Sequence, residues 1–313
     1  MKLLSIVVPV YNLEACIERC IRSLYRQNLD TENYEVIFIN DGSTDRTTDI
    51  IKMNWQENML LLEQENARQG AARNNGVRNA TGKYIWFVDG DDAIEDNCLK
   101  KLTDTLEKYS PDILFTGRKI FTDSGTYTTT RGCLVEEETS RIYSGSDYLS
   151  KRNLTLGPCF FFRKQFLLKN NLFFMEKTFY EDSEFMPRAC FLAERIMHLN
   201  YTPYLIYERE GSSMRSINPN LMFDALSVSA QLLHFALKRK EEKGSEHLFY
   251  YAVMAFNVAM SKSQDATLSQ KSKFWKQVSL LELIEAMIRS KHLKYLCEIP
   301  YVLFKTHMRC LNT

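Results

Sequence analysis

The sequence predicts a mixed α/β fold with a mostly parallel sheet flanked by helices, followed by a helical C-terminal appendage. Short β-branched runs alternate with helical segments over the first ninety residues, which indicates parallel strands joined by right-handed crossovers. From Pro219 onward nearly every segment has helical periodicity. The chain has 313 residues, 45% of them hydrophobic, enough for one large domain or for one domain and an appendage.

Four buried strands are expected in the first ninety residues, because short apolar runs bounded by polar turns recur there. These runs are Leu4 to Val8, Val36 to Ile39, Met59 to Leu62, and Tyr84 to Val88.

The segments between these strands are expected to be helices. Apolar side chains recur at i, i+3 and i+4 from Leu13 to Leu24, and Asn12 is the expected N-cap of that helix. A second helix is expected to begin near Thr44, and a third spans Gly70 to Ala80.

After residue 94 the pattern becomes mixed, and we expect strands and helices without regular alternation. Helices are predicted from Glu95 to Tyr109 and from Glu181 to about Ala193. Predicted strands are Ile113 to Gly117, a hairpin over Phe121 to Thr130, and Cys159 to Arg163. We place the end of this first domain at residue 214 and the helical region at residues 215–313.

Charge is balanced over the whole chain, with 40 basic and 39 acidic residues, but it is unevenly distributed. Residues 215–313 hold 14 basic and 8 acidic residues, a net charge of +6, which leaves −5 for residues 1–214. An acidic first domain argues against nucleic acid as a partner and suits a site for a metal cation. The basic region favours contact with an anionic surface.

Cysteine and histidine spacing predicts neither disulfides nor a zinc site. Cys16 and Cys20 are four residues apart on a predicted helix, and the eight cysteines include no CxxC pair. Neither a secretory signal nor an apolar stretch of about 18 residues is present. We therefore expect buried, reduced thiols and a cytoplasmic protein.

Polar residues follow each of the four predicted strands. They lie at 9–12, 40–43, 63–68 and 89–92. In open α/β sheets ligands bind beyond the carboxyl ends of the strands. The sequence therefore predicts one site at this edge of the sheet.

Asp89-Gly90-Asp91-Asp92 is the strongest local signal for that site. Three carboxylates within four residues repel one another, and Mg²⁺ and Mn²⁺ prefer carboxylate oxygens. The alternative is an acidic turn in which Asp92 or Asn97 caps the next helix. The position at a strand end favours the cation.

Asp41 and Arg73 are two further candidates for nucleotide contacts. Asp41, at the exit of the second strand, is suited to accept the imide N–H of a uracil, although Ser43 or Thr44 at this turn also suits a helix cap. Arg73, near the start of a helix, suits a phosphate or ribose; the alternative is a solvated arginine.

Two downstream segments complete the set of candidates. Glu181 and Asp182 are adjacent, so we expect one to point into a cleft as a general base while the other caps or orients; the alternative is acidic residues favoured at a helix N-terminus. In the segment 207–213, Arg209 and Ser212 suit closure over a diphosphate, or form an ordinary polar loop.

Taken together and in this order, the motifs resemble those of family 2 of the inverting glycosyltransferases, which have the GT-A fold of nucleotide-diphospho-sugar transferases. The matching segments are Ser5-Ile6-Val7-Val8-Pro9-Val10-Tyr11-Asn12, Asn40-Asp41-Gly42-Ser43-Thr44-Asp45, Gly70 with Ala72-Arg73-Asn74 and Gly76, Gly82-Lys83-Tyr84-Ile85, Asp89-Gly90-Asp91-Asp92 and Tyr180-Glu181-Asp182-Ser183-Glu184-Phe185. The last of these looks like the acidic motif of bacterial polysaccharide enzymes.

The resemblance implies a glycosyltransferase domain over residues 1–214, with a nucleotide-binding half at 1–110 and an acceptor half at 111–214. It implies a UDP-sugar donor, a glycan or lipid-linked saccharide acceptor, and bound Mn²⁺ or Mg²⁺. Asp182 is implied as catalytic base with Glu181 in support, and Asp91 and Asp89 as metal ligands. The implied nucleotide-binding residues are Pro9, Tyr11, Asn12, Asp41, Arg73, Asp89, Arg209 and Ser212.

This sequence departs from the family pattern in places. Related chains often have Trp and Lys where this one has Gly157-Pro158-Cys159-Phe160, and no Gln-x-x-Arg-Trp motif occurs, so a processive synthase is not expected. Two alternatives stay open: a catalytically silent sugar-nucleotide-binding subunit of a glycan assembly complex, and a nucleotidylyltransferase. The basic helical region and residues 300–310 also suggest peripheral contact with the inner face of the cell membrane.

Overall fold

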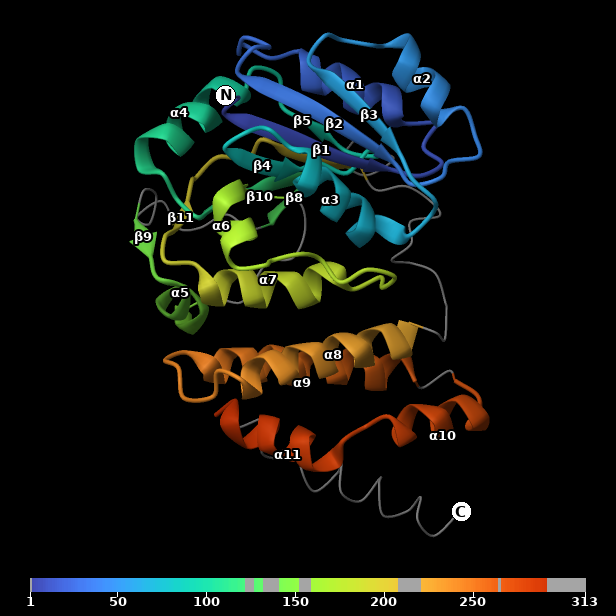
Figure 1. The fold of residues 1–313 in the computed structure, drawn as a ribbon, viewed down its shortest axis with the longest axis vertical. Coiled ribbons are helices and arrows are strands. Elements are labelled where there is room, and N and C mark those ends of the chain that lie inside the picture. The colour runs from blue at the N-terminus through green and yellow to red at the C-terminus, as the bar shows by residue number, and fades with distance from the viewer. Residues whose placement is uncertain are drawn as a thin grey trace.

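The computed structural model describes residues 2–121, 127–131, 141–151, 159–207, 221–263 and 266–291. Within them the main sheet has eight strands in the order β3-β2-β1-β4-β10-β6-β11-β9 (Figure 1). Its strands are β1 (Leu4–Val10), β2 (Tyr34–Asn40), β3 (Met59–Glu63), β4 (Tyr84–Phe87), β6 (Ile113–Phe115), β9 (Ile142–Tyr143), β10 (Phe160–Arg163) and β11 (Ile196–His198).

The N-terminal part of this sheet is parallel, as the alternating pattern predicted. β1 lies between β2 and β4 and pairs in parallel with both, while β2 pairs in parallel with β3. Beyond β4 the sheet is mixed, because β10 runs antiparallel to both β4 and β6. Every residue of β1 and β2 is buried, as expected for strands that helices cover on both faces.

Alternate residues of β1 belong to two separate cores, one on each face of the sheet. Leu4, Ile6 and Val8 pack with α1 and α4, whereas Val7 packs with α3, α6 and α7. The helices of this domain are α1 (Ile17–Tyr25), α2 (Thr47–Met53), α3 (Arg68–Asn79), α4 (Leu99–Tyr109), α5 (Gly145–Lys151), α6 (Lys164–Lys169) and α7 (Glu181–Leu192).

A smaller sheet adjoins the main one, with the strand order β5-β12-β7-β8. It comprises β5 (Ala93–Ile94), β7 (Arg118–Phe121), β8 (Tyr127–Arg131) and β12 (Tyr204–Tyr207). β7 and β8 form the antiparallel hairpin expected from the sequence. β5 directly follows Asp89–Asp92 and pairs with β12. The small sheet is therefore joined directly to the acidic turn.

The helical region consists of α8 (Leu221–Leu237), α9 (Ser245–Lys262), α10 (Leu268–Lys276) and α11 (Leu280–Arg289). These helices have a third apolar core of their own. α8 and α9 pack against α7, which therefore lies between the main sheet and the helical region (Figure 1). The expected boundary at residue 214 lies outside the described residues.

Two helices begin later than predicted. α1 begins at Ile17, and Asn12 does not cap it; the Asn12 Oδ1 accepts a hydrogen bond from the Thr44 N–H at 2.8 Å. α2 begins at Thr47, not near Thr44, and has no side-chain cap. The Asn12 N–H also donates to Ser43 Oγ at 3.0 Å, so the polar groups after β1 and β2 satisfy one another and not the helix ends.

The predicted start of α4 was also wrong, and the alternative in which the acidic turn caps this helix does not hold. This helix begins at Leu99, four residues later than expected, and neither Asp92 nor Asn97 caps it. Instead the side-chain oxygen Oε1 of Gln27, just beyond the end of α1, accepts from the N–H groups of Cys98 and Leu99 at 2.9 and 3.1 Å. The Asp92 carboxylate therefore does not bind the N-terminus of α4.

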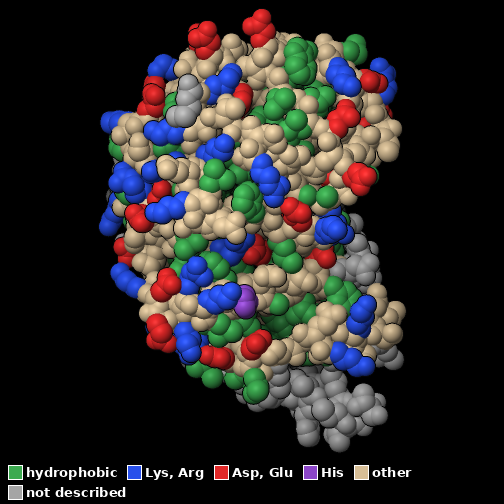
Figure 2. All heavy atoms as spheres, in the orientation of Figure 1, with side chains coloured by type: hydrophobic (Ala, Val, Ile, Leu, Met, Phe, Trp, Pro, Cys, Tyr) green, Lys and Arg blue, Asp and Glu red, His purple; other side chains and the backbone are tan. Residues whose placement is uncertain are grey.

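The described cysteines are free thiols, as their spacing predicted. On the face shown in Figure 2, acidic and basic side chains are interspersed. Among the described residues Cys20, Cys98, Cys159 and Cys190 are buried free thiols, and Cys16 is half-buried and also unbonded to sulfur. No helix in this part of the chain has both the length and the apolar character to cross a membrane.

Candidate active site

The ends of β1, β2 and β4 meet at one edge of the main sheet, as the strand order requires. The Asp41 N–H donates to the Val10 carbonyl at 2.9 Å, and the Val88 N–H donates to the Val7 carbonyl at 3.0 Å. These backbone bonds hold the three strand exits in register. The polar residues after each strand are therefore neighbours, although they are widely separated in sequence.

Pro9, Tyr11 and Asn12 lie at the exit of β1. Pro9 is buried within the strand and pairs with Ile39 of β2. Tyr11 is 48% exposed, and Asn12 is exposed with a φ of 51°. The exposed Tyr11 ring and the buried Pro9 thus border the surface beside Asp41.

Asp41 is 3% exposed and lies at the exit of β2. Its Oδ1 accepts hydrogen bonds from the side-chain amide of Gln64 at 2.8 Å and from the Ala67 N–H at 2.9 Å. Gly42, which follows, has a φ of 77°, which favours glycine. The carboxylate is thus fixed through Oδ1 by two hydrogen bonds.

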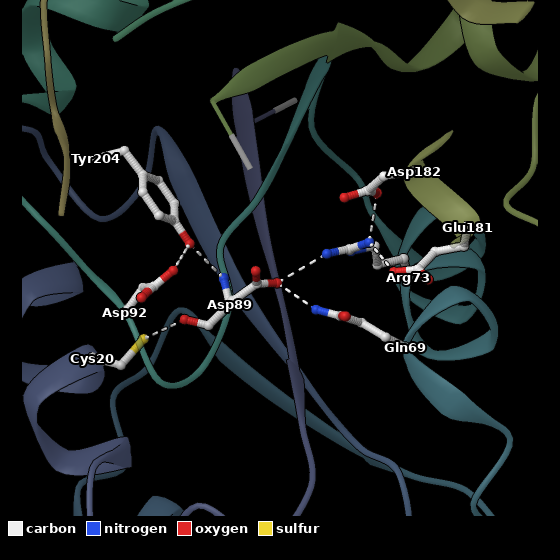
Figure 3. A network of polar contacts seen from close by, with 8 residues as sticks. All are labelled: Cys20, Gln69, Arg73, Asp89, Asp92, Glu181, Asp182 and Tyr204. Carbon is white, nitrogen blue, oxygen red and sulfur yellow. Dashed lines mark hydrogen bonds and ion pairs between the residues drawn. The ribbon is translucent and has the colours of Figure 1, made fainter. Parts of the chain in front are cut away.

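Arg73 of α3 lies at the centre of a buried ionic cluster (Figure 3). Its Nη2 lies 3.0 Å from Asp89 Oδ1, and its Nη1 lies 2.9 Å from Glu181 Oε1 and 2.8 Å from Asp182 Oδ1. Its side chain is only 3% exposed. Burial lowers the pKa of Arg73, but Asp182, Asp89 and Glu181 outweigh burial and raise it. The cluster therefore joins the acidic turn after β4 to the start of α7.

Both carboxylates of the Glu181–Asp182 pair point toward Arg73, which corrects the expectation that adjacent residues must diverge. The pair occupies the first turn of α7, where side chains can reach a group beyond the helix end. Glu181 is 7% exposed and Asp182 is 29% exposed. Asp182 is thus the member of the pair that solvent or an acceptor can reach.

The environment favours the protonated forms of both acids. Burial, and then the charge of Asp182, raises the pKa of Glu181 to about 7, although Arg73 opposes the shift. Burial likewise raises the pKa of Asp182, again against the effect of Arg73. An acid with a raised pKa is better matched to proton transfer near neutral pH.

A close approach between α3 and the segment before α7 brings the cluster together. A Cβ atom on Gly70 would lie 2.5 Å from the Met175 carbonyl oxygen and 3.4 Å from the Glu181 Cβ. Only glycine fits such a contact with backbone. The sequence run around Gly70 therefore determines how near Arg73 comes to Glu181.

Asp89 and Asp91 supply the donor chemistry that a hard divalent cation requires. Asp89 has a side chain 21% exposed and Asp91 is half-buried on the same turn. The described residues contain no group of three or more His, Cys, Asp or Glu side chains placed to hold a metal. Two carboxylates and no further ligands fit Mg²⁺ or Mn²⁺, which are commonly bound by one or two carboxylates together with substrate phosphates.

Sequence reasoning missed three side chains of this site. Gln69 donates to Asp89 Oδ1 at 2.6 Å; it lies one helical turn before Arg73, and that i, i+4 spacing is the signal that was available. Gln64 holds Asp41, and Tyr204 contacts the acidic turn. Two predicted nucleotide contacts, Arg209 and Ser212, lie outside the described residues.

This chain is similar to a known protein family, to curated relatives and to solved structures. Residues 5–179 match the family described as Glycosyl transferase family 2. The glycosyltransferase GlyG of Streptococcus pneumoniae is 30% identical over 226 residues, which are 69% of this chain and 74% of that protein. The uncharacterized glycosyltransferase EpsJ of Bacillus subtilis is 33% identical over 67% of this chain and 62% of its own length.

Other relatives are longer proteins. The poly(ribitol-phosphate) beta-glucosyltransferase of Bacillus spizizenii is 32% identical over 67% of this chain but only 33% of its own length. The chain thus spans less than two thirds of several curated relatives, 62%, 16% and 33% for three of them.

Among solved structures, residues 1–349 of Staphylococcus aureus TarS in complex with UDP-GlcNAc superpose with a TM-score of 0.68 at 22% identity, over 93% of this chain and 82% of that one. This likeness shows the GT-A fold, with its mostly parallel sheet and flanking helices. The family match covers more than half of the chain and includes every strand exit described above. The chain therefore belongs to glycosyl transferase family 2 and has the GT-A fold.

Proposed function

We propose that this protein transfers one sugar from a UDP-sugar to a hydroxyl of a glycan or lipid-linked saccharide acceptor, with inversion at the anomeric carbon, in surface polysaccharide synthesis. The observation that carries the proposal is the Arg73 cluster, which joins Asp89 of the acidic turn to Asp182 of α7. The donor diphosphate and the acceptor hydroxyl would then lie on opposite sides of the Arg73 guanidinium. A relative named as a poly(ribitol-phosphate) beta-glucosyltransferase supports the acceptor class. A TarS structure in complex with UDP-GlcNAc supports the donor class.

In this proposal Asp182 accepts the proton of the acceptor hydroxyl as that oxygen attacks the anomeric carbon. Arg73 holds the Asp182 Oδ1 at 2.8 Å, so the base is oriented before the acceptor arrives. Glu181 supports this position from the same nitrogen at 2.9 Å. A single in-line displacement with one base gives inversion.

Nucleotide contacts are proposed for the residues at the strand exits. Asp41 would accept the uracil imide N–H through its second oxygen, with Pro9 and Tyr11 beside the base and Asn12 next to them. Asp89 would lie near the ribose, supported by Arg73. Asp91, with Asp89, would hold Mn²⁺ or Mg²⁺, which as a Lewis acid stabilises the charge of the departing UDP. Arg209 and Ser212 would close over the diphosphate.

The test is thermal unfolding with UDP, GDP, CDP and ADP, each with and without Mn²⁺. Saturation at about 100 times the dissociation constant adds roughly 2.7 kcal/mol to the free energy of unfolding, and the midpoint rises by several degrees. We expect a shift with UDP and Mn²⁺ that Asp91→Asn abolishes. A shift with another nucleotide would change the proposed donor, and no shift with any of them would contradict the proposed nucleotide site.

We also propose that the helical region makes peripheral contact with the inner face of the cell membrane. Leu281 and Ile288 of α11 are 81% and 56% exposed, and their seven-residue spacing places them on one helix face. Arg289 and Lys291 lie beside them. Replacing both apolar residues by Glu should reduce flotation with phosphatidylglycerol liposomes, whereas Met53→Glu, at an apolar position 78% exposed on α2, should not.

A further inference from the structure

The acidic turn Asp89–Asp92 carries three carboxylates in four residues, and it leaves β4 at the proposed nucleotide site. Like charges at this spacing repel one another. A turn that must present two of them to a cation needs other contacts to keep its shape. The structure supplies these contacts from two elements, β12 and α1, represented in Figure 3 by Tyr204 and Cys20.

From the small sheet, the Tyr204 hydroxyl contacts the turn at both of its ends. It accepts a hydrogen bond from the Asp89 N–H at 3.0 Å and donates one to Asp92 Oδ2 at 2.8 Å. The other Asp92 oxygen, Oδ1, accepts from the Tyr207 N–H at 3.1 Å. Tyr204 is 0% exposed and Asp92 is 6% exposed, so no water competes for these bonds.

α1 also holds the turn, through the backbone carbonyls of the turn. Nη2 of Arg19 donates to the Asp91 carbonyl at 2.5 Å, and the Cys20 thiol lies 3.9 Å from the Asp89 carbonyl. The Tyr207 ring stacks on the Arg19 guanidinium, 3.8 Å from ring centroid to Cζ. Arg19 therefore contacts both β12 and the acidic turn.

The middle of the turn packs against the end of β1 and the segment that leads into α1. A Cβ on Gly90 would lie 2.7 Å from Leu13 Cδ1 and 2.8 Å from Val10 Cγ1. The backbone of the turn therefore has no room to shift toward these side chains.

We propose that Tyr204 and Asp92 are positioning residues that preset the acidic turn so that Asp91 and Asp89 face the metal-bound diphosphate. The inference rests on the proposed function and adds residues to which that function assigns no role. Asp92 is the third carboxylate of the motif, and both of its oxygens accept hydrogen bonds from β12. It anchors the turn so that the other two carboxylates can be presented together.

The energetic reason is that removing the Tyr204 hydroxyl takes away the partner of two buried polar groups, the Asp89 N–H and the Asp92 Oδ2. A buried group without a partner costs more than the net gain of the hydrogen bond it loses. The turn is then expected to tilt until these groups find new partners, which moves Asp91. Groups that orient metal ligands in this way typically change metal affinity by about 10- to 100-fold.

The test compares Tyr204→Phe with a matched control, Tyr84→Phe. The Tyr84 hydroxyl is buried in the same core and donates to the Leu106 carbonyl at 3.3 Å, away from the turn. Binding of Mn²⁺ in the presence of UDP is measured from the electron paramagnetic resonance signal of free Mn²⁺, beside the unfolding midpoint. We expect both variants to lose stability, but only Tyr204→Phe to weaken Mn²⁺ binding, by about tenfold.

A second pair of variants keeps the test open if Tyr204→Phe does not fold. Arg19→Met removes the bond to the Asp91 carbonyl from a half-buried site, and Arg22→Met changes an exposed arginine of the same helix that pairs with Glu18. Arg19→Met should weaken Mn²⁺ binding at least threefold, and Arg22→Met should leave it unchanged.

The outcomes separate the two proposals. If the wild-type protein binds neither UDP nor Mn²⁺, the proposed function fails. If the wild-type protein binds both, but Tyr204→Phe and Arg19→Met bind Mn²⁺ as their controls do, then the positioning role is wrong and the contacts serve stability alone.

Discussion

Nη1 of Arg73 lies 2.8 Å from Oδ1 of Asp182, although the two residues are 109 positions apart in the chain. The same nitrogen contacts Glu181, and Nη2 contacts Asp89. One buried cation thus sets the distance between the acidic turn after β4 and the proposed base at the start of α7. The predictions below follow from this cluster and from the packing that supports it.

Asp182→Asn is expected to lower turnover by 10²- to 10⁴-fold, the usual contribution of a general base. The amide keeps an oxygen for Arg73 but has no affinity for the acceptor proton. UDP affinity, measured by calorimetry, should stay within about twofold of wild type. A variant with full turnover would show that another group takes the proton.

Arg73→Met is expected to reduce the free energy of unfolding by about 3–5 kcal/mol, because it leaves buried carboxylates without their counter-ion. Urea unfolding measures the change. Adding Glu181→Gln to Arg73→Met should recover part of the loss, since it removes one of the unpaired charges. If the double variant is as unstable as the sum of the two single variants, the coupling between these residues is absent.

Stability should also depend on pH through Glu181. Its pKa is raised from 4.5 to about 7 in the fold, so the folded state holds this proton more tightly than the unfolded state does. The free energy of unfolding is then highest below pH 4.5 and falls as pH rises toward 7, by at most about 1.4 kcal/mol per unit. Urea unfolding from pH 5 to 8 should show a smaller fall in Glu181→Gln than in wild type.

The parallel half of the fold was predictable because each of its signals is local. β1 to β4 and their helices follow from β-branched runs and helical spacing, and the strand exits of a parallel sheet must share one edge. This alone predicted that Asp41 and Asp89 lie at one site. Arg73, Glu181 and Asp182 were each singled out on local grounds as well.

What the sequence did not reveal is how side chains from distant elements satisfy one another. Asn12 was expected to cap a helix, but the Thr44 N–H competes for its oxygen. Gln27, just beyond the end of α1, caps α4, and no pattern in the sequence singled out Tyr204. Glu181 and Asp182 were expected to diverge, because helical geometry says nothing about a shared partner beyond the helix end.

Base recognition can be tested at Asp41. Asp41→Asn can still accept from Gln64 and Ala67 through its one oxygen, but it then presents an N–H₂ group where a uracil imide N–H would arrive. Loss of a hydrogen bond to a charged group, about 1.5–3 kcal/mol, corresponds to a 10- to 150-fold weaker UDP complex. CDP lacks the imide proton, so its affinity should not fall. Equal losses for both nucleotides would contradict a base contact.

The last prediction concerns the packing of α3, the helix that carries Arg73, against β1. A Cβ on Gly76 would lie 2.2 Å from Val7 Cγ1 and 2.9 Å from Val7 Cγ2, and both residues are buried in the core beneath the cluster. Gly76→Ala should therefore reduce the free energy of unfolding by about 1–3 kcal/mol through overpacking, despite the higher helix propensity of alanine. Val7→Ala removes both methyl groups, so the double variant should be more stable than the sum of the two single losses predicts. Strict additivity in urea unfolding would place the cost of Gly76→Ala elsewhere than against β1.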